Sequence, residues 1–296
     1  MLGLETPVER LQHMNQPAYE FYLNRNPGID LAADRLEIGV CAQHNNGGID
    51  VDLWWRSSIA GLFPVGEAAG AHGVARPGGA ALNSAQVGAT RAAQWIAARE
   101  QGAARADEGW QELAGDALQK ARSLLEAACG REESSGVLID DVLMESTRAM
   151  SDNAGLVRSR QGLEELARNV AEWRRRVVDE CVVDPTSRRS VDRLFLVRDI
   201  LDVQAVYVAA MLDHLDHGVG SRGSVLYTDP DGDLPVSWWN DGADLDVEEI
   251  FRHRLDSKAH HGVTQRVSVD AVGEAIHAHW GPVRPIPTED EFLENV

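Results

Sequence analysis

The residues best suited to chemistry lie in a glycine-rich stretch from Gln43 to Gln94. Within it, the short apolar run from Gly61 to Val65 predicts a buried strand. Gly66 and Glu67 follow directly. A carboxylate that comes straight after a buried strand, on a glycine turn, suits a ligand rich in hydroxyl groups, such as a ribose. Glu67 is therefore a candidate binding residue, and a simple helix-capping role is the alternative.

The next part of the same stretch combines a polar loop with a helix start. The loop contains His72 and Arg76 and leads into Gly78 and Gly79. The alanine-rich residues from about Ala80 to Glu100 then predict a long helix. A glycine pair lets a flat ligand lie close to the backbone. The helix N-terminus presents unpaired N–H groups and partial positive charge, which favour negative charge on that ligand.

Three segments in this order, HNNGGI, GLFPVGEAAG and HGVARPGGAAL, resemble the motif series of the FAD-dependent fumarate reductase, succinate dehydrogenase and aspartate oxidase flavoproteins. Those proteins carry a histidine-containing segment ending in GGI, then a strand ending in GE, then HGANR, NSL and a helix. Two later segments extend the resemblance: STRAMSDNAGLVRS at 146–159, and SRG from Ser221 to Gly223. The chain is thus similar to the C-terminal portion of this family.

The resemblance implies that FAD is the cofactor and that hydride passes between the flavin and a small saturated or unsaturated carboxylate. Arg76 would bind the substrate carboxylate through two parallel hydrogen bonds. His72 would line the same pocket, and Gln43 or His44 would donate a hydrogen bond to the substrate. The implied catalytic residues are Arg76, His72 and His44. The implied cofactor-binding residues are Gly47, Gly48, Gly66, Glu67, Gly78, Gly79, Ala80, Ala81 and Leu82. Structural roles in loop packing and tight turns are the alternatives for all of them.

The chain departs from the family pattern at three places on the substrate side. Gln43 occupies the position of the family's histidine, and His44 that of its tyrosine. The family's NSL reads Ala80-Ala81-Leu82 here, and Pro77 replaces a leucine. These changes bear on dicarboxylate specificity more than on the flavin, because much of the flavin contact is made by backbone groups.

The strand–GxGxxG–helix segment that binds the FAD pyrophosphate does not occur near the start of these 296 residues. The string from Gly218 to Gly223 has the glycine spacing but follows a predicted helix, so we interpret it as a chance match. We therefore expect a second subunit that carries the N-terminal FAD-binding and capping segments, unless the chain is a fragment. The alternative function is that of a non-catalytic subunit or decayed flavoprotein that acts through protein–protein interaction.

The predicted fold class is α/β plus all-α: the C-terminal half of a Rossmann-like FAD-binding domain, then a helical bundle, then an irregular C-terminal tail. Apolar runs from Leu36 to Ala42 and from Ile59 to Val65 predict buried strands in the first part. The bundle should contain three or four helices. The expected domains are a remnant of the capping domain (1–36), the C-terminal part of the FAD-binding domain (37–104), the bundle (105–218) and a mostly irregular segment that wraps the others (219–296).

Two runs of apolar residues step by three and four positions, and each predicts one buried helix face. The first is Leu163, Leu166, Val170, Trp173 and Val177; the second is Leu196, Ile200, Val203, Tyr207 and Met211. The histidines and aspartates at 213–217 are interpreted as a solvated acidic face rather than a metal site. The tryptophan pairs are interpreted as packing residues.

Composition argues against several classes of function. A formal net charge of -19 repels nucleic acid and anionic membranes. No apolar run is long enough to cross a membrane, and the N-terminus does not resemble a signal peptide. Cys41, Cys129 and Cys181 lie far apart without a CxxC pair, which argues against a disulfide framework and against a zinc or iron–sulfur site. These features favour a cytoplasmic protein.

Overall fold

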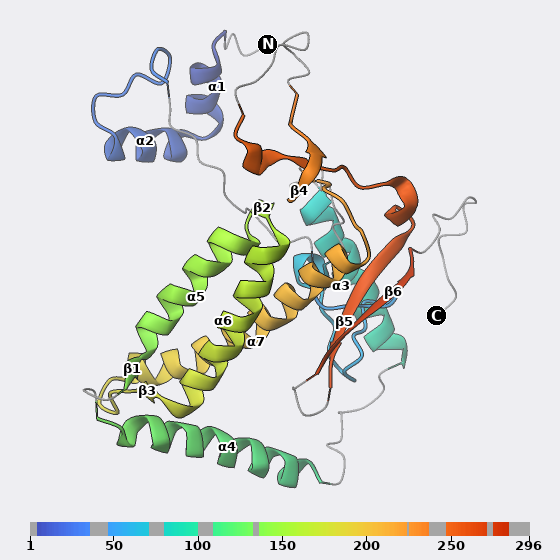
Figure 1. Ribbon diagram of the computed structural model, residues 1–296. Helices are drawn as coiled ribbons and strands as arrows, with labels where there is room; N and C mark the ends of the chain where they lie inside the picture. Colours follow the sequence, from blue (N-terminus) through green and yellow to red (C-terminus); the bar gives the residue numbers. More distant parts are fainter. Residues whose placement is uncertain are drawn as a thin grey trace. The chain divides into compact units, whose positions relative to one another are not determined.

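The computed structural model describes residues 5–35, 47–70, 80–99, 109–132, 136–223, 225–236, 247–270 and 275–283 (Figure 1). The chain divides into two compact units, Met1–Asn45 and Asn46–Val296.

The smaller unit contains two short helices, α1 (Pro7–Met14) and α2 (Gln16–Arg25). Thr6 begins α1 with a capping box, in which its hydroxyl accepts the Glu9 N–H and the Glu9 carboxylate accepts the Thr6 N–H. Asn15 ends α1 and caps α2. Neither helix has a buried residue. The contacts that stabilise these two helices are therefore mainly hydrogen bonds at the helix ends. The assignment of residues 1–36 to a remnant of the family's capping domain stays a prediction.

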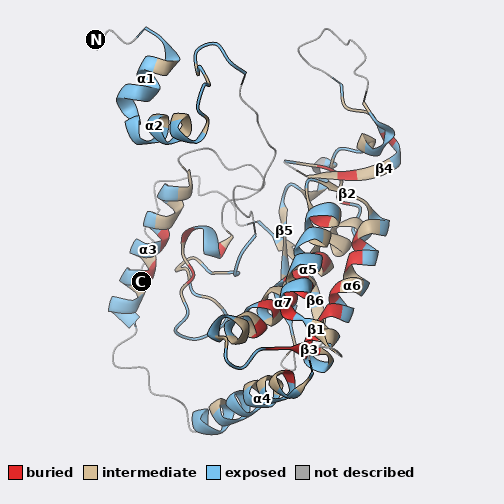
Figure 2. Cartoon of the chain, turned by 90° about the vertical axis from the view of Figure 1, so that its left-hand side faces the viewer, coloured by how far each residue is buried: buried red, intermediate tan, exposed pale blue. Residues whose placement is uncertain are grey.

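The larger unit is dominated by helices α4 (Trp110–Gly130), α5 (Ile139–Ala154), α6 (Arg160–Asp179) and α7 (Arg188–Asp216). Ser159 and Ser187 start α6 and α7, and their hydroxyls accept N–H groups from the first turn of each helix. Figure 2 shows the buried residues on the sides of α5, α6 and α7 that face one another. The prediction of a helical bundle in this region is confirmed.

Two short parallel strand pairs lie at opposite ends of the bundle (Figure 1). At one end β1 (Val137–Leu138) pairs with β3 (Cys181–Val182), and next to it the Val183 N–H donates to the Ala128 carbonyl of α4. At the other end β2 (Val157–Arg158) pairs with the first residues of β4 (Leu226–Asp233). These pairs hold the helix connections in place.

One of the two predicted helix faces is correct and the other is wrong. All five residues of the α6 face are buried. On α7, however, the buried face is Leu194, Val197, Leu201, Gln204 and Val208, whereas Leu196 and Val203 are about half exposed. Helix α7 carries two apolar stripes, and spacing alone does not reveal which one meets α5 and α6.

The C-terminal region contains more regular structure than the sequence predicted. After β4, two 3₁₀ turns, η3 (Glu249–Phe251) and η4 (Lys258–His260), lead into an antiparallel hairpin of β5 (Val263–Val269) and β6 (Ile276–Pro282). The hairpin packs on α7, where the Gln265 side chain donates to the Ala210 carbonyl. The sequence did not predict this hairpin, which forms where α7 covers one of its faces.

The buried strand predicted from Ile59 to Val65 does not form. The Leu62 N–H donates to the Ile59 carbonyl and the Leu62 carbonyl accepts the Ser57 N–H, so this segment turns back on itself. Ile59 is 64% exposed. A strand needs a neighbour for its backbone groups, and the described residues place none beside it. The other predicted strand, Leu36 to Ala42, lies outside the described residues.

The same region contains a 3₁₀ turn, η1 (Gly66–Ala69), and the long helix α3 (Ala80–Arg99). The α3 helix confirms the prediction for the alanine-rich stretch. The described sheets each have two strands. The fold is therefore mixed α/β and mostly helical, and the described residues do not form the larger sheet that the Rossmann-like prediction required.

The α7 correction can be tested by two matched substitutions. Leu201→Ala removes a fully buried side chain and should lower the free energy of unfolding by about 2–5 kcal/mol. Leu196→Ala changes a half-exposed side chain and should cost less than about 1 kcal/mol. Urea unfolding of both variants measures the difference. A larger loss for Leu196→Ala would restore the face predicted from the sequence.

Candidate functional site

Two glycine segments predicted to line one site are in direct backbone contact. A Cβ atom placed on Gly48 would lie 2.3 Å from the Gly70 backbone nitrogen and 2.5 Å from the Ala68 carbonyl oxygen. A Cβ atom on Gly70 would meet the Gly48 nitrogen at 2.3 Å. The Ile49 N–H donates to the Ala68 carbonyl at 2.8 Å. Both positions therefore require glycine, and Gly70 also has a φ of 63°, in the left-handed region.

The turn that contains Glu67 lies against α3. Gly66 has a φ of 64°, and a Cβ atom there would lie 3.0 Å from the Ala85 Cβ. Glu67 is the second residue of η1 and is exposed. The structure thus brings the GGI segment, the Glu67 turn and the first turns of α3 together.

Stacked arginine and tryptophan side chains hold α3 against the loop at residues 52–56. The Arg91 Nε donates to the Leu53 carbonyl, and its guanidinium lies 4.5 Å from the Trp54 ring. Arg56 lies 4.0 Å from the Trp95 ring. These contacts are typical cation–π stacks. The sequence predicted packing roles for the tryptophan pairs but not these arginine partners, because each stack joins α3 to a loop more than 30 residues away in the chain.

Gly88, in the middle of α3, lets the loop at residues 52–56 lie close to the helix. A Cβ atom on Gly88 would lie 2.8 Å from ring atoms of Trp55. Trp55 itself has a φ of 60°, which is strained for a residue with a bulky side chain. The indole thus occupies space that only glycine leaves free. The second tryptophan pair, Trp238 and Trp239, lies outside the described residues.

The glycine loop also borders the bundle and the hairpin. A Cβ atom placed on Gly47 would lie 3.9 Å from the Tyr207 ring of α7. Asp50 forms an ion pair with Arg266 of β5 at 3.1 Å. Elements far apart in the chain therefore surround this loop.

Several predicted site residues lie outside the described residues: Gln43, His44, His72, Arg76, Gly78 and Gly79. Of the predicted helix-start residues, Ala80 and Ala81 are half-buried, whereas Leu82 is 74% exposed. The described part of the candidate site thus consists of the glycine loop, the Glu67 turn and the start of α3.

The SRG segment is built into a buried polar network next to the end of α7. The buried Ser221 hydroxyl accepts the Tyr227 N–H at 2.8 Å, and the Ser221 backbone exchanges hydrogen bonds with Arg254 and Asp256. Asp256 has a side-chain exposure of 1%, pairs with Arg222 at 3.6 Å and bonds His260 at 2.8 Å. Burial raises the pKa of Asp256, but the hydrogen bonds from His260 and Gly220 and the charge of Arg222 outweigh it, so its pKa is below the usual range.

The end of α7 differs from the solvated acidic face that the sequence predicted. The Asp213 carboxylate accepts hydrogen bonds from Gln265 and Trp280 of the hairpin, each at 2.7 Å. The rings of His214 and His217 lie 5.4 Å and 5.0 Å from the Trp280 ring. These residues hold the hairpin on α7. In the described part of the chain, no cluster of three or more histidine, cysteine or acidic side chains could bind a metal ion.

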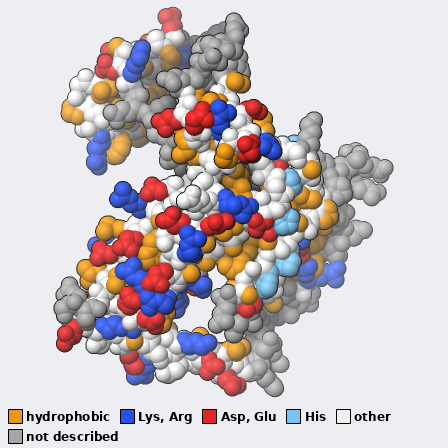
Figure 3. All heavy atoms as spheres, viewed as in Figure 1, with side chains coloured by type: hydrophobic (Ala, Val, Ile, Leu, Met, Phe, Trp, Pro, Cys, Tyr) orange, Lys and Arg blue, Asp and Glu red, His pale blue; other side chains and the backbone are white. Residues whose placement is uncertain are grey.

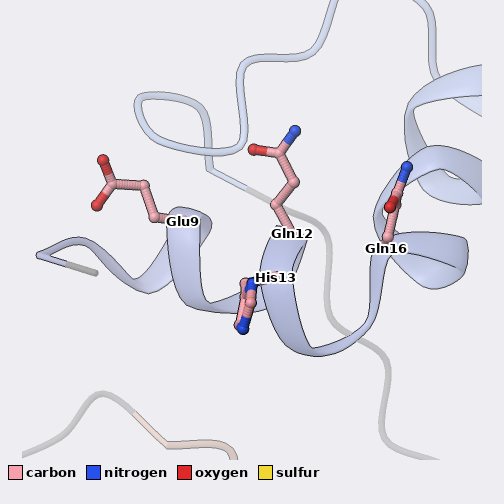
Figure 4. A pocket seen from close by; sticks show the side chains of 4 residues that line it. All are labelled: Glu9, Gln12, His13 and Gln16. Carbon is pink, nitrogen blue, oxygen red and sulfur yellow. The ribbon is translucent and has the colours of Figure 1, made fainter. Parts of the chain in front are cut away.

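The smaller unit does not offer a comparable site among its described residues. A shallow pocket beside α1 is lined by Glu9, Gln12, His13 and Gln16, but Figure 4 shows these side chains pointing in different directions. On the face in Figure 3, acidic and basic side chains are intermixed over the bundle. Among the helices that the structure describes, none is both long and apolar enough to span a bilayer.

Solved structures with a similar fold include chains of fumarate reductases and of Mycobacterium smegmatis Sdh1. The FrdA chain of an E. coli quinol fumarate reductase mutant matches 94% of this chain with a TM-score of 0.69 and 19% identity. A quinol–fumarate reductase with menaquinol gives a TM-score of 0.64 over 95% of this chain, and Mycobacterium smegmatis Sdh1 in complex with UQ1 gives 0.57 over 95%. The chain has the fold of the C-terminal part of these flavoprotein chains.

A sequence relative agrees with the fold. One of the subunits of the fumarate reductase (CoM/CoB) of Methanothermobacter marburgensis is 39% identical over 66 residues, which is 22% of this chain and 12% of that protein. No family model matches the chain. The chain is related to the fumarate reductase/succinate dehydrogenase flavoprotein family. It spans less than half the length of the solved family chains, covering 43% of FrdA.

The contact between Gly48 and Gly70 gives a stability prediction. Gly48→Ala places a methyl group inside backbone contact distance and should lower the free energy of unfolding by about 1–3 kcal/mol. Gly115→Ala in α4 is the matched control, because a Cβ atom there meets nothing and the helix should gain about 0.5–1 kcal/mol. Urea unfolding measures both. Equal stability of the Gly48→Ala variant and the parent would contradict the close approach.

His214 predicts a pH dependence of stability. Burial, reinforced by the charge of Arg222, lowers the pKa of His214 to about 4. The unfolded chain takes up this proton near pH 6.5, so the free energy of unfolding should fall as the pH drops from 6.5 to about 4. The contribution is up to about 3 kcal/mol.

The measurement is urea unfolding across that pH window for His214→Gln, with His277→Gln at an exposed position as control. His214→Gln should flatten the profile, and His277→Gln should leave it unchanged. An unaltered profile in the His214 variant would show that its proton uptake is not linked to folding.

Proposed function

We propose that the chain is a component of an FAD-dependent oxidoreductase that transfers hydride between flavin and a small saturated or unsaturated carboxylate. The observation that carries the proposal is the backbone contact between Gly48 and Gly70, which places the GGI segment and the Glu67 turn side by side. The same two segments belong to the motif series shared with the related flavoproteins. Catalysis and FAD binding by this chain are both part of the proposal.

In this proposal, the glycine loop, the Glu67 turn and the start of α3 would hold the flavin dinucleotide. The glycines let the two backbone segments meet without side chains between them, and the Ile49 N–H bonds the Ala68 carbonyl across the contact. Glu67 is exposed on its turn and can bind ribose hydroxyls. Ala80 and Ala81 begin α3 with small side chains, so a ligand can approach the helix N-terminus. When bound, FAD would supply the hydride chemistry.

The residues proposed for the substrate follow from the motif. Arg76 would bind and polarise the carboxylate, which stabilises negative charge that develops beside the reacting carbon–carbon bond. His72 would line the pocket, and Gln43 or His44 would orient the substrate by a hydrogen bond. Because the family's NSL is replaced by Ala80-Ala81-Leu82, side-chain contacts at the helix start would be lost and backbone contacts kept.

The proposal requires a pyrophosphate-binding segment from outside these 296 residues. No GxGxxG between a strand and a helix occurs in the sequence, and the string at Gly218 follows α7. A partner chain with the FAD-binding and capping segments would supply it. Such a complex would complete the sheet that the described residues do not form.

Purification under mild conditions from the protein's own cells tests the proposal. The expected product is a yellow complex whose flavin absorbance is bleached by succinate or restored by fumarate after reduction. Mass spectrometry should find a strand–GxGxxG–helix segment in the complex. A colourless preparation that contains that segment and fails to take up added FAD would reject the oxidoreductase and favour a non-catalytic, protein-binding role.

A further inference from the structure

An apolar groove runs along the side of the bundle between α5 and α7. It has a volume of about 420 Å³ and is lined mainly by Met150 of α5 and by Ile200, Val203 and Tyr207 of α7. These α7 residues belong to the stripe that the sequence assigned to the bundle core. Val203 is 53% exposed. The described residues leave Leu196 and Val203 of this stripe about half exposed, although the stripe has the composition of a buried helix face.

Gln204 provides a second observation at the same groove. Its side chain lines the groove and is only 6% exposed, and its Oε1 atom is buried without a hydrogen-bond partner. A buried acceptor without a donor costs about 1–3 kcal/mol. The groove therefore suits an occupant that brings an N–H or O–H donor together with apolar side chains.

The groove is continuous with the candidate flavin site. Tyr207 lines the groove, and a Cβ atom placed on Gly47 of the glycine loop would lie 3.9 Å from its ring. Whatever covers Ile200 and Val203 would thus reach the loop that the proposed function assigns to FAD. The related solved chains are more than twice as long as this chain, which covers 43% of FrdA. The larger remainder of such a fold needs apolar surface to pack on.

We propose that this groove is the docking surface for the FAD-binding part of the flavoprotein fold, supplied from outside these 296 residues. The inference rests on the proposed function and adds the place of contact. Apolar side chains of the partner cover Ile200 and Val203, and a donor from the partner bonds Gln204 Oε1. The contact aligns the partner with the glycine loop through Tyr207.

Photo-cross-linking in the protein's own cells tests the docking surface. A photoreactive phenylalanine analogue is placed at Val203, or at Val178 of α6 as a control with the same exposure, 52% against 53%. The expected result is a cross-link from position 203 to the polypeptide segment that carries the strand–GxGxxG–helix motif, and none from position 178. A cross-link to a second copy of this chain, no cross-link, or equal yields at both positions would overturn the proposal.

Charge substitutions give an independent readout. Val203→Glu should weaken association with that segment at least about tenfold, because it places a carboxylate in an apolar contact. Val178→Glu should leave association unchanged, and both variants should unfold like the parent because both side chains are half exposed. Equal association of the two variants would contradict the surface. A colourless complex that still cross-links at position 203 would reject hydride transfer and support the docking surface.

Discussion

Leu166, Leu194 and Leu201 are completely removed from solvent where α6 and α7 pack together, and Val142 of α5 closes the same core. Each fully buried aliphatic side chain contributes about 1.5–3 kcal/mol. The other elements of the larger unit depend on this packing. Helix α4 joins it through Ala128, and the strand pairs β1–β3 and β2–β4 fix the connections at its two ends.

Helix α7 connects this packed core to the hairpin and to the candidate site. It is 29 residues long, and its C-terminal end lies against the hairpin instead of ending in solvent. Asp213 joins the two because a single carboxylate accepts both Gln265 and Trp280. Polar groups in such a network direct the hairpin to one position, where apolar contact alone would allow sliding. The same helix presents Tyr207 to the glycine loop, so the bundle also positions the candidate site.

The candidate site has a different physical basis. Gly48 and Gly70 meet backbone to backbone, and Trp55 fills the space beside Gly88. Arginine–tryptophan stacks then hold α3 to this loop. The exposed stripe of α7 and the missing strand at Ile59 to Val65 have one explanation in the proposed function, since both would be completed by the FAD-binding part of the fold.

The helical bundle, the α6 face and the start of α3 could be predicted from the sequence, because they follow from the local periodicity of apolar residues and from alanine content. It also indicated the relation to the flavoproteins through short motifs whose glycines the backbone requires, as Gly48 shows. Which α7 stripe is buried could not be predicted in this way, because Leu201 and Ile200 follow equally good helical patterns and differ only in what packs against them. Tertiary contacts likewise decided that Asp213 binds the hairpin and that no strand forms from Ile59 to Val65. A carboxylate needs a donor and a strand needs a partner, and neither is a local property.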